Sequence, residues 1–176
     1  MKKVLLTGDS LIEFFDWQRR FPQYAIANKG IAGETVKGLL LGLPFITKYI
    51  ENPDAIVLMI GTNNLATEDY AFMGDYQEIL EKFRSWYPHS RIAATSLLPL
   101  YLPWLAPDAI GRINAGLKRL TDTLGVDYLD LFSEFKVQGS AERNLFLEDG
   151  VHLSDAGYSL WSNVLDKYFS EIFAAG

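Results

Sequence analysis

The sequence of 176 residues contains no cysteine and only two histidines, His89 and His152. Without cysteine the chain can form no disulfide, use no thiolate nucleophile and offer no cysteine-ligated zinc or iron–sulfur site. With two histidines a histidine-rich metal site is improbable as well. We therefore expect an activity that needs neither a metal nor a cofactor.

Basic blocks and long apolar runs are missing too. The formal net charge of −6 argues against a nucleic-acid partner, which would require a basic patch. The opening "MKKVLL" imitates a signal peptide, but its apolar run Val4–Leu6 is far shorter than the roughly 7–15 residues of a secretory core. No apolar stretch approaches the roughly 20 residues that span a bilayer. We expect no transmembrane segment and a cytoplasmic location, unless a leader has been trimmed.

What is present is typical of a globular α/β protein. The hydrophobic share is 49% and the charged share 22%, and the length suits a single domain over residues 1–176. Short apolar runs predict strands at Lys3–Thr7, Tyr24–Asn28, Ala55–Ile60, Ile92–Thr95 and Val126–Leu131. The run Ala55–Ile60 is apolar on both faces, which indicates a strand covered by helices on each side.

Between the strands, apolar residues recur every three or four positions, as in amphipathic helices. Three such stripes are Phe72, Tyr76, Ile79, Phe83 and Trp86; Ile110, Ile113, Leu117, Leu120 and Leu124; and Tyr158, Trp161, Leu165, Tyr168 and Ile172. Ser154 and Asp155 stand where the N-cap of the last helix belongs. The alternation of strand and helix predicts a mostly parallel sheet, whose ligands bind beyond the carboxyl ends of the strands.

Polar residues gather at that predicted rim. Gly8–Ser10 follows the first strand, Gly33–Thr35 the second and Asn63 the third, while Asp149 and His152 precede the last helix. A serine hydroxyl needs an adjacent base to act as a nucleophile, and a carboxylate can orient that base. We therefore expect Ser10, His152 and Asp149 to act together in acyl transfer.

Each of these residues has a plainer interpretation. Ser10 alone would be an ordinary helix N-cap, and His152 a surface turn residue. Glu148 competes with Asp149 as the partner of His152, whereas His89 lies in the polar segment "YPHSR" and is expected to be solvated. The convergence of the whole set on one rim favours the catalytic interpretation.

The negative charge that develops on the substrate's carbonyl oxygen also needs donors. The N–H groups of Ser10 and Gly33 can supply them, because a glycine turn lets the backbone approach closely. The side-chain amide of Asn63 is the third candidate. These residues are expected to form an oxyanion hole.

Gly8-Asp9-Ser10-Leu11, Gly33, Asn63 and Asp149-x-x-His152 resemble the four sequence blocks of the SGNH hydrolases, also called the GDSL esterase/lipase family. The resemblance implies a flavodoxin-like, three-layer α/β/α sandwich with a five-stranded parallel sheet in the order 2-1-3-4-5. It also implies the nucleophile, base, acid and oxyanion roles given above. One departure is Asn64, which replaces an aspartate with a mainly structural role in the family and leaves the local hydrogen bonds open.

The segment Leu98–Pro107 is rich in proline and apolar residues. Four of its side chains are candidates for a substrate pocket beside the rim: Tyr101, Leu102, Trp104 and Leu105. The alternatives are a partly buried loop or an apolar patch for self-association, so a homo-oligomer stays open.

These observations favour a serine esterase that acts on a small-molecule ester, with a short acyl group such as acetyl on a carbohydrate or small alcohol. A lysophospholipase or thioesterase with longer acyl chains is the runner-up, for which the apolar 98–107 segment is the reason. A non-catalytic, anion-binding flavodoxin-like module is less favoured, because anion binding would not require Asp149 and His152 at the same rim. The esterase hypothesis predicts a rate that rises with pH as His152 loses its proton.

Overall fold

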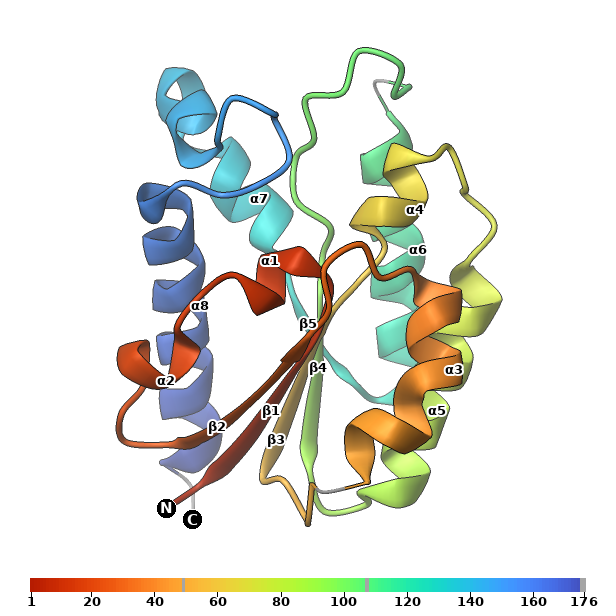
Figure 1. Cartoon of the computed structure of the whole chain (residues 1–176), viewed down its shortest axis with the longest axis vertical. Coiled ribbons are helices and arrows are strands. Elements are labelled where there is room, and N and C mark those ends of the chain that lie inside the picture. Colours follow the sequence, from red (N-terminus) through yellow and green to blue (C-terminus); the bar gives the residue numbers. More distant parts are fainter. Residues whose placement is uncertain (49, 107, 175–176) are drawn as a thin grey trace.

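The computed structural model describes residues 1–48, 50–106 and 108–174. Within these residues, parallel strands form one five-stranded sheet in the order β2-β1-β3-β4-β5 (Figure 1). The strands are β1 (Lys3–Gly8), β2 (Ala25–Gly30), β3 (Ala55–Met59), β4 (Arg91–Thr95) and β5 (Asp127–Leu129). The predicted sheet and strand order are confirmed, and every strand lies within two residues of its expected bounds.

The fifth strand is shorter than the predicted Val126–Leu131. Asp130 ends it, because its carboxylate accepts a hydrogen bond from Ser133 N–H at 3.1 Å and caps a helix that begins at Leu131. The expected strand therefore contained the start of a helix.

Helices cover both faces of the sheet (Figure 1). One layer contains α2 (Trp17–Arg20), α7 (Leu131–Lys136) and α8 (Asp155–Phe173), and the other contains α3 (Val36–Thr47), α5 (Met73–Trp86) and α6 (Ala109–Leu124). The shorter α1 (Ser10–Glu13), α4 (Thr62–Ala66) and the 3-10 helix η1 (Gly139–Leu145) lie near the carboxyl ends of the strands. This is the predicted α/β/α sandwich.

Successive side chains of a strand point to opposite faces of the sheet, so the strands contribute to two hydrophobic cores, one on each face. In β1, Val4 and Leu6 pack with Trp161 of α8, whereas Leu5 packs with Leu39 of α3 on the opposite face. Because both faces are covered, the strands are apolar at nearly every position.

The three predicted helical stripes are confirmed as α5, α6 and α8. Ser154 caps α8, with its hydroxyl accepting from Gly157 N–H at 3.3 Å. Trp86 continues the apolar stripe of α5 in sequence, but as the last residue of that helix it is exposed. In the described residues, no helix is long and apolar enough to cross a membrane.

Candidate active site

The turn after β1 presents Ser10 at the rim of the sheet. Gly8 has a φ of +155°, and a Cβ there would lie 1.7 Å from the Met59 carbonyl oxygen, so only glycine fits between β1 and β3. Asp9 follows as the N-cap of α1, with Oδ1 accepting from Leu11 N–H at 3.0 Å. Ser10 is thus the first residue of α1 and not its cap.

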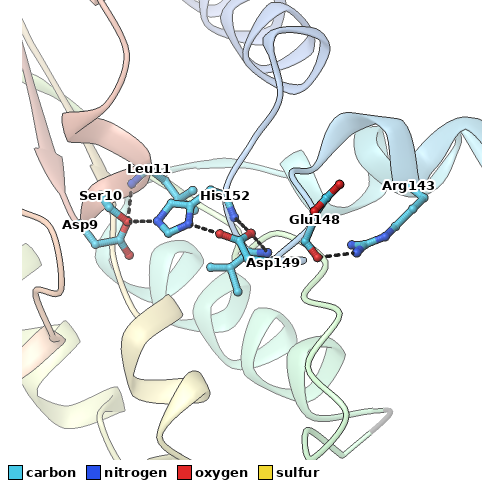
Figure 2. A network of polar contacts seen from close by, with 8 residues as sticks. Asp9, Ser10, Leu11, Arg143, Glu148, Asp149 and His152 are labelled. Atoms are coloured by element: carbon cyan, nitrogen blue, oxygen red, sulfur yellow. Dashed lines mark hydrogen bonds and ion pairs between the residues drawn. The ribbon is translucent and has the colours of Figure 1, made fainter.

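A continuous chain of hydrogen bonds joins Ser10, His152 and Asp149 (Figure 2). Ser10 Oγ lies 3.0 Å from His152 Nε2, and His152 Nδ1 lies 2.6 Å from Asp149 Oδ2. The three residues come from opposite ends of the chain, and the fold brings them together as the sequence predicted.

Asp149 contacts both the ring and the main chain of His152. Its Oδ1 accepts from Val151 N–H and His152 N–H, each at 2.9 Å, while Oδ2 contacts the imidazole. Burial alone would raise the pKa of Asp149, but these hydrogen bonds from His152 and Val151 lower it to about 2. The carboxylate is therefore ionised wherever a histidine can exchange its proton.

The two alternatives named from the sequence, Glu148 and His89, take no part in this chain of hydrogen bonds. In Figure 2, Asp149 lies between His152 and Glu148, and Glu148 accepts from Arg143 through its main-chain carbonyl at 3.1 Å. His89 is exposed between α5 and β4, at the opposite end of the sheet. Asp149 is accordingly the carboxylate that pairs with the His152 imidazole.

The turn that carries His152 rests on Tyr101. Gly150 has a φ of +73°, and a Cβ there would lie 2.8 Å from Tyr101 Cβ. Tyr101 N–H donates to the Gly150 carbonyl at 3.0 Å, and the Arg143 guanidinium lies 4.6 Å from the Tyr101 ring centre. Tyr101, predicted as a pocket residue, thus supports the turn before His152.

The other predicted pocket residues lie in different environments. Leu105 is partly buried against the core on the α3, α5 and α6 side of the sheet, and Leu102 is half-buried. Trp104 is 55% exposed and donates its indole N–H to the Ala66 carbonyl of α4 at 3.1 Å. Pro107, the last residue of the predicted segment, lies outside the described residues.

The turn that contains Gly33 is linked to the start of α1 on one side and to Asn63 on the other. Ile31 N–H donates to the Gly8 carbonyl at 3.0 Å, which ties the end of β2 to the turn before Ser10. Gly33 has a φ of +77° and faces open space, since no described atom lies within 4 Å of the position that a Cβ would take there. Asn63 Nδ2 donates to the Glu34 carbonyl at 2.8 Å, so the amide lies against the Gly33 turn.

Asp9 has a property that its sequence position did not reveal. Its side chain is fully buried, and Oδ2 has no well-formed hydrogen bond among the described residues. Burial raises the pKa of Asp9 to about 6, against the lowering effects of the Leu11 N–H, the Thr62 side chain and His152. An Asp before a Ser indicates no more than a simple turn, because burial depends on the surrounding fold.

Across residues 1–48, 50–106 and 108–174, no group of three or more histidine, aspartate or glutamate side chains is placed to hold a metal ion. The chemistry that the site offers is that of a serine hydroxyl, an imidazole and a carboxylate in line. Such an arrangement suits acyl transfer.

Comparison with known proteins identifies the family. The model of the GDSL-like Lipase/Acylhydrolase family matches residues 8–160. The chain belongs to this family. It is an acylhydrolase, a hydrolase of carboxylic esters.

Individual relatives of this GDSL-family chain are distant. Platelet-activating factor acetylhydrolase IB subunit alpha2 of Rattus norvegicus is 26% identical over 167 residues, which cover 89% of this chain and 71% of that protein. A solved structure from Streptococcus pneumonia, named for platelet activating factor, is 26% identical with a TM-score of 0.85, covering 95% of this chain and 83% of that one. The lipase/acylhydrolase from Enterococcus faecalis has a TM-score of 0.81 at 20% identity, covering 97% and 96%.

In this GDSL-family chain, Asn64 takes the place of the aspartate expected from the family resemblance. Its Oδ1 accepts from Val36 N–H at 3.0 Å, at the start of α3, and its Nδ2 donates to Asp69 Oδ2 at 2.7 Å. Thr35 caps the same helix by accepting from Gly38 N–H at 3.1 Å. Asn64 therefore keeps the acceptor function of an aspartate and adds a donor that Asp69 uses.

Proposed function

We propose that this acylhydrolase is a serine esterase that hydrolyses acetyl or similarly short esters of a carbohydrate or small alcohol through an acyl-enzyme. The observation that carries the proposal is the hydrogen-bond chain from Ser10 Oγ through His152 to Asp149, at 3.0 and 2.6 Å. Both distances are within the normal range for a nucleophile, its base and the group that orients the base.

In the proposed reaction, Ser10 Oγ attacks the ester carbonyl while His152 Nε2 takes its proton. His152 then delivers that proton to the departing alkoxide as the C–O bond breaks. Water, deprotonated by the same nitrogen, attacks the acyl-enzyme and releases the acid and Ser10. Asp149 stabilises the imidazolium at each stage, since it is ionised throughout.

The proposed oxyanion donors are the N–H groups of Ser10 and Gly33 and the amide of Asn63. Ser10 begins α1, where first-turn N–H groups have no partner within the helix. The open space at Gly33 leaves room for a substrate oxygen. Loss of one such donor typically costs about 10²–10³ in rate.

The acyl group is proposed to be short because the mammalian relatives are named acetylhydrolases. A longer acyl chain is the second candidate, and the exposed Trp104 on the rim beside α4 favours it. A module that only binds anions is disfavoured, because it would have no use for an imidazole paired with both a serine and a carboxylate.

Labelling with a fluorophosphonate and turnover of p-nitrophenyl esters test the proposal. We expect hydrolysis of p-nitrophenyl acetate, a mass adduct on Ser10, and at least a roughly 10³-fold loss of rate in Ser10→Ala. Ser159 is an exposed serine on α8, and Ser159→Ala is the matched control. This variant should keep the hydrolysis of p-nitrophenyl acetate and the adduct on Ser10. Absence of turnover and of the adduct in the wild type would refute the esterase.

An acyl series from acetyl to octanoyl then decides the substrate class. A sharp fall in kcat/KM beyond butyryl supports the short-chain enzyme, whereas rising values with length support the second candidate.

A further inference from the structure

A second surface feature adjoins the reacting residues. A cavity of about 580 Å³ opens beside His152, between the end of α1 and the start of α8. Its lining includes Phe14, Leu147, His152, Leu153, Ser154 and Tyr158. The volume lies within the range of small-molecule sites.

Two large apolar side chains at this cavity are exposed to solvent. Phe14 is 59% exposed and Leu147 is 50% exposed, whereas Leu153 beside them is buried. The Phe14 ring centre lies 5.6 Å from that of His152, with the planes 32° apart. Exposed apolar groups that adjoin a catalytic imidazole indicate a surface for an apolar part of a ligand.

Main-chain hydrogen bonds tie the backbone of both residues to Ser10 and His152. Phe14 N–H donates to the Ser10 carbonyl at 2.9 Å, one helical turn after the nucleophile. Leu147 N–H donates to the His152 carbonyl at 2.7 Å. One apolar group is thus held to the nucleophile and the other to the base.

The chemistry decides which part of an ester meets this cavity. His152 Nε2 must reach the leaving-group oxygen to protonate it, so the alcohol lies on the side of the imidazole. The carbonyl oxygen lies instead toward the proposed donors at Gly33 and Asn63. A cavity lined by the imidazole itself is therefore positioned for the alcohol.

We propose that this cavity binds the alcohol part of the ester, and that Phe14 and Leu147 select alcohols with an aromatic or aliphatic group. This inference rests on the proposed function and narrows its substrate class. It places alcohol selection on α1 and the turn before His152, apart from the predicted pocket residues that follow β4.

Two isomeric esters test the assignment. Benzyl acetate carries its phenyl group on the alcohol, and methyl phenylacetate carries it on the acid. We expect Phe14→Ala to lower the ratio of kcat/KM for benzyl acetate over methyl phenylacetate by about tenfold, the lower end for loss of an apolar contact in a specificity pocket. Leu147→Ala should lower the same ratio.

Phe45→Ala is the matched control, since Phe45 is 79% exposed on α3, and it should leave the ratio at the wild-type value. A ratio unchanged in both cavity variants, or raised by them, overturns the alcohol assignment while the esterase stands. If the wild type hydrolyses neither ester and Ser10 is not labelled, both proposals fail. Thermal unfolding of each variant verifies that folding is intact.

Discussion

At the scale of single residues, Asn64 shows why an amide can replace a carboxylate at a structural position. Its oxygen satisfies Val36 N–H at the start of α3, and its nitrogen satisfies a carboxylate oxygen of Asp69. The hydrogen bond from Asn64 also helps to lower the pKa of Asp69, after that from Ala71 N–H. A carboxylate at position 64 would accept at α3 but repel Asp69.

We therefore predict that Asn64→Asp lowers the free energy of unfolding by about 1–3 kcal/mol, because it replaces the amide that donates to Asp69 at 2.7 Å with a buried carboxylate facing the carboxylate of Asp69. The double variant Asn64→Asp/Asp69→Asn should recover most of this loss, since donor and acceptor are merely exchanged. Urea unfolding of the four proteins in the cycle measures the coupling. A double variant no more stable than Asn64→Asp would contradict the described pair.

Elements differ in how far the sequence could predict them. The strands and the long helices α5, α6 and α8 were predictable, because their apolar periods extend over several repeats. Helix α3 was not assigned from its period, since Gly38, Gly42 and Pro44 interrupt it. Its start depends on caps from Thr35 and from Asn64, which is distant in sequence. Helices of four to six residues, such as α1 and α4, are too short to show a period.

The turn that carries His152 provides a prediction at the same scale. Gly150→Ala should lower kcat at least about tenfold, because the new methyl group meets Tyr101 and the φ of +73° is unfavourable for alanine. The displaced turn would carry the imidazole away from Ser10. Esterase kinetics with p-nitrophenyl acetate provide the measurement.

Gly111→Ala in α6 is the control for that change. No described atom lies within 4 Å of a Cβ at Gly111, and alanine favours a helix, so activity should be preserved. Equal activity of the two variants would show that Gly150 is not needed to place the base.

At the scale of the whole molecule, the site was easier to predict than its surroundings. The grouping of Ser10, Asp149 and His152 could be predicted, because their residue types suit one another and a parallel sheet collects strand ends at one rim. The cavity beside His152 was not, since Phe14 and Leu147 are residue types that are usually buried. Their exposure depends on how the turn before α8 packs against α1, which no local pattern encodes.

The fully buried Asp9 makes the stability of the whole fold depend on pH. Its pKa is raised from 3.8 to about 6, so between these values the folded protein binds more protons than the unfolded chain, and stability falls as the pH rises. The stability that protonated Asp9 contributes is fully present below about pH 4 and is lost above about pH 6. Two pKa units correspond to about 3 kcal/mol.

Asp9→Asn removes the buried charge. We predict that the unfolding free energy of Asp9→Asn relative to the wild type increases by up to about 3 kcal/mol between pH 4 and pH 8. Urea titrations across this range test the prediction, with Asp122→Asn on the exposed face of α6 as the control. A difference that does not change with pH would show that Asp9 carries no buried charge.

The single turn of α1 has a consequence for how the enzyme can diversify. Ser10 begins this helix and Phe14 is its C-cap, about 5.4 Å of helix pitch away, so an insertion between them would displace Phe14 relative to Ser10. Trp104, by contrast, lies on a long segment that follows β4. If the cavity beside His152 binds the alcohol as proposed, a change of alcohol preference would come from side-chain substitution at fixed backbone positions, whereas the segment after β4 can change in length.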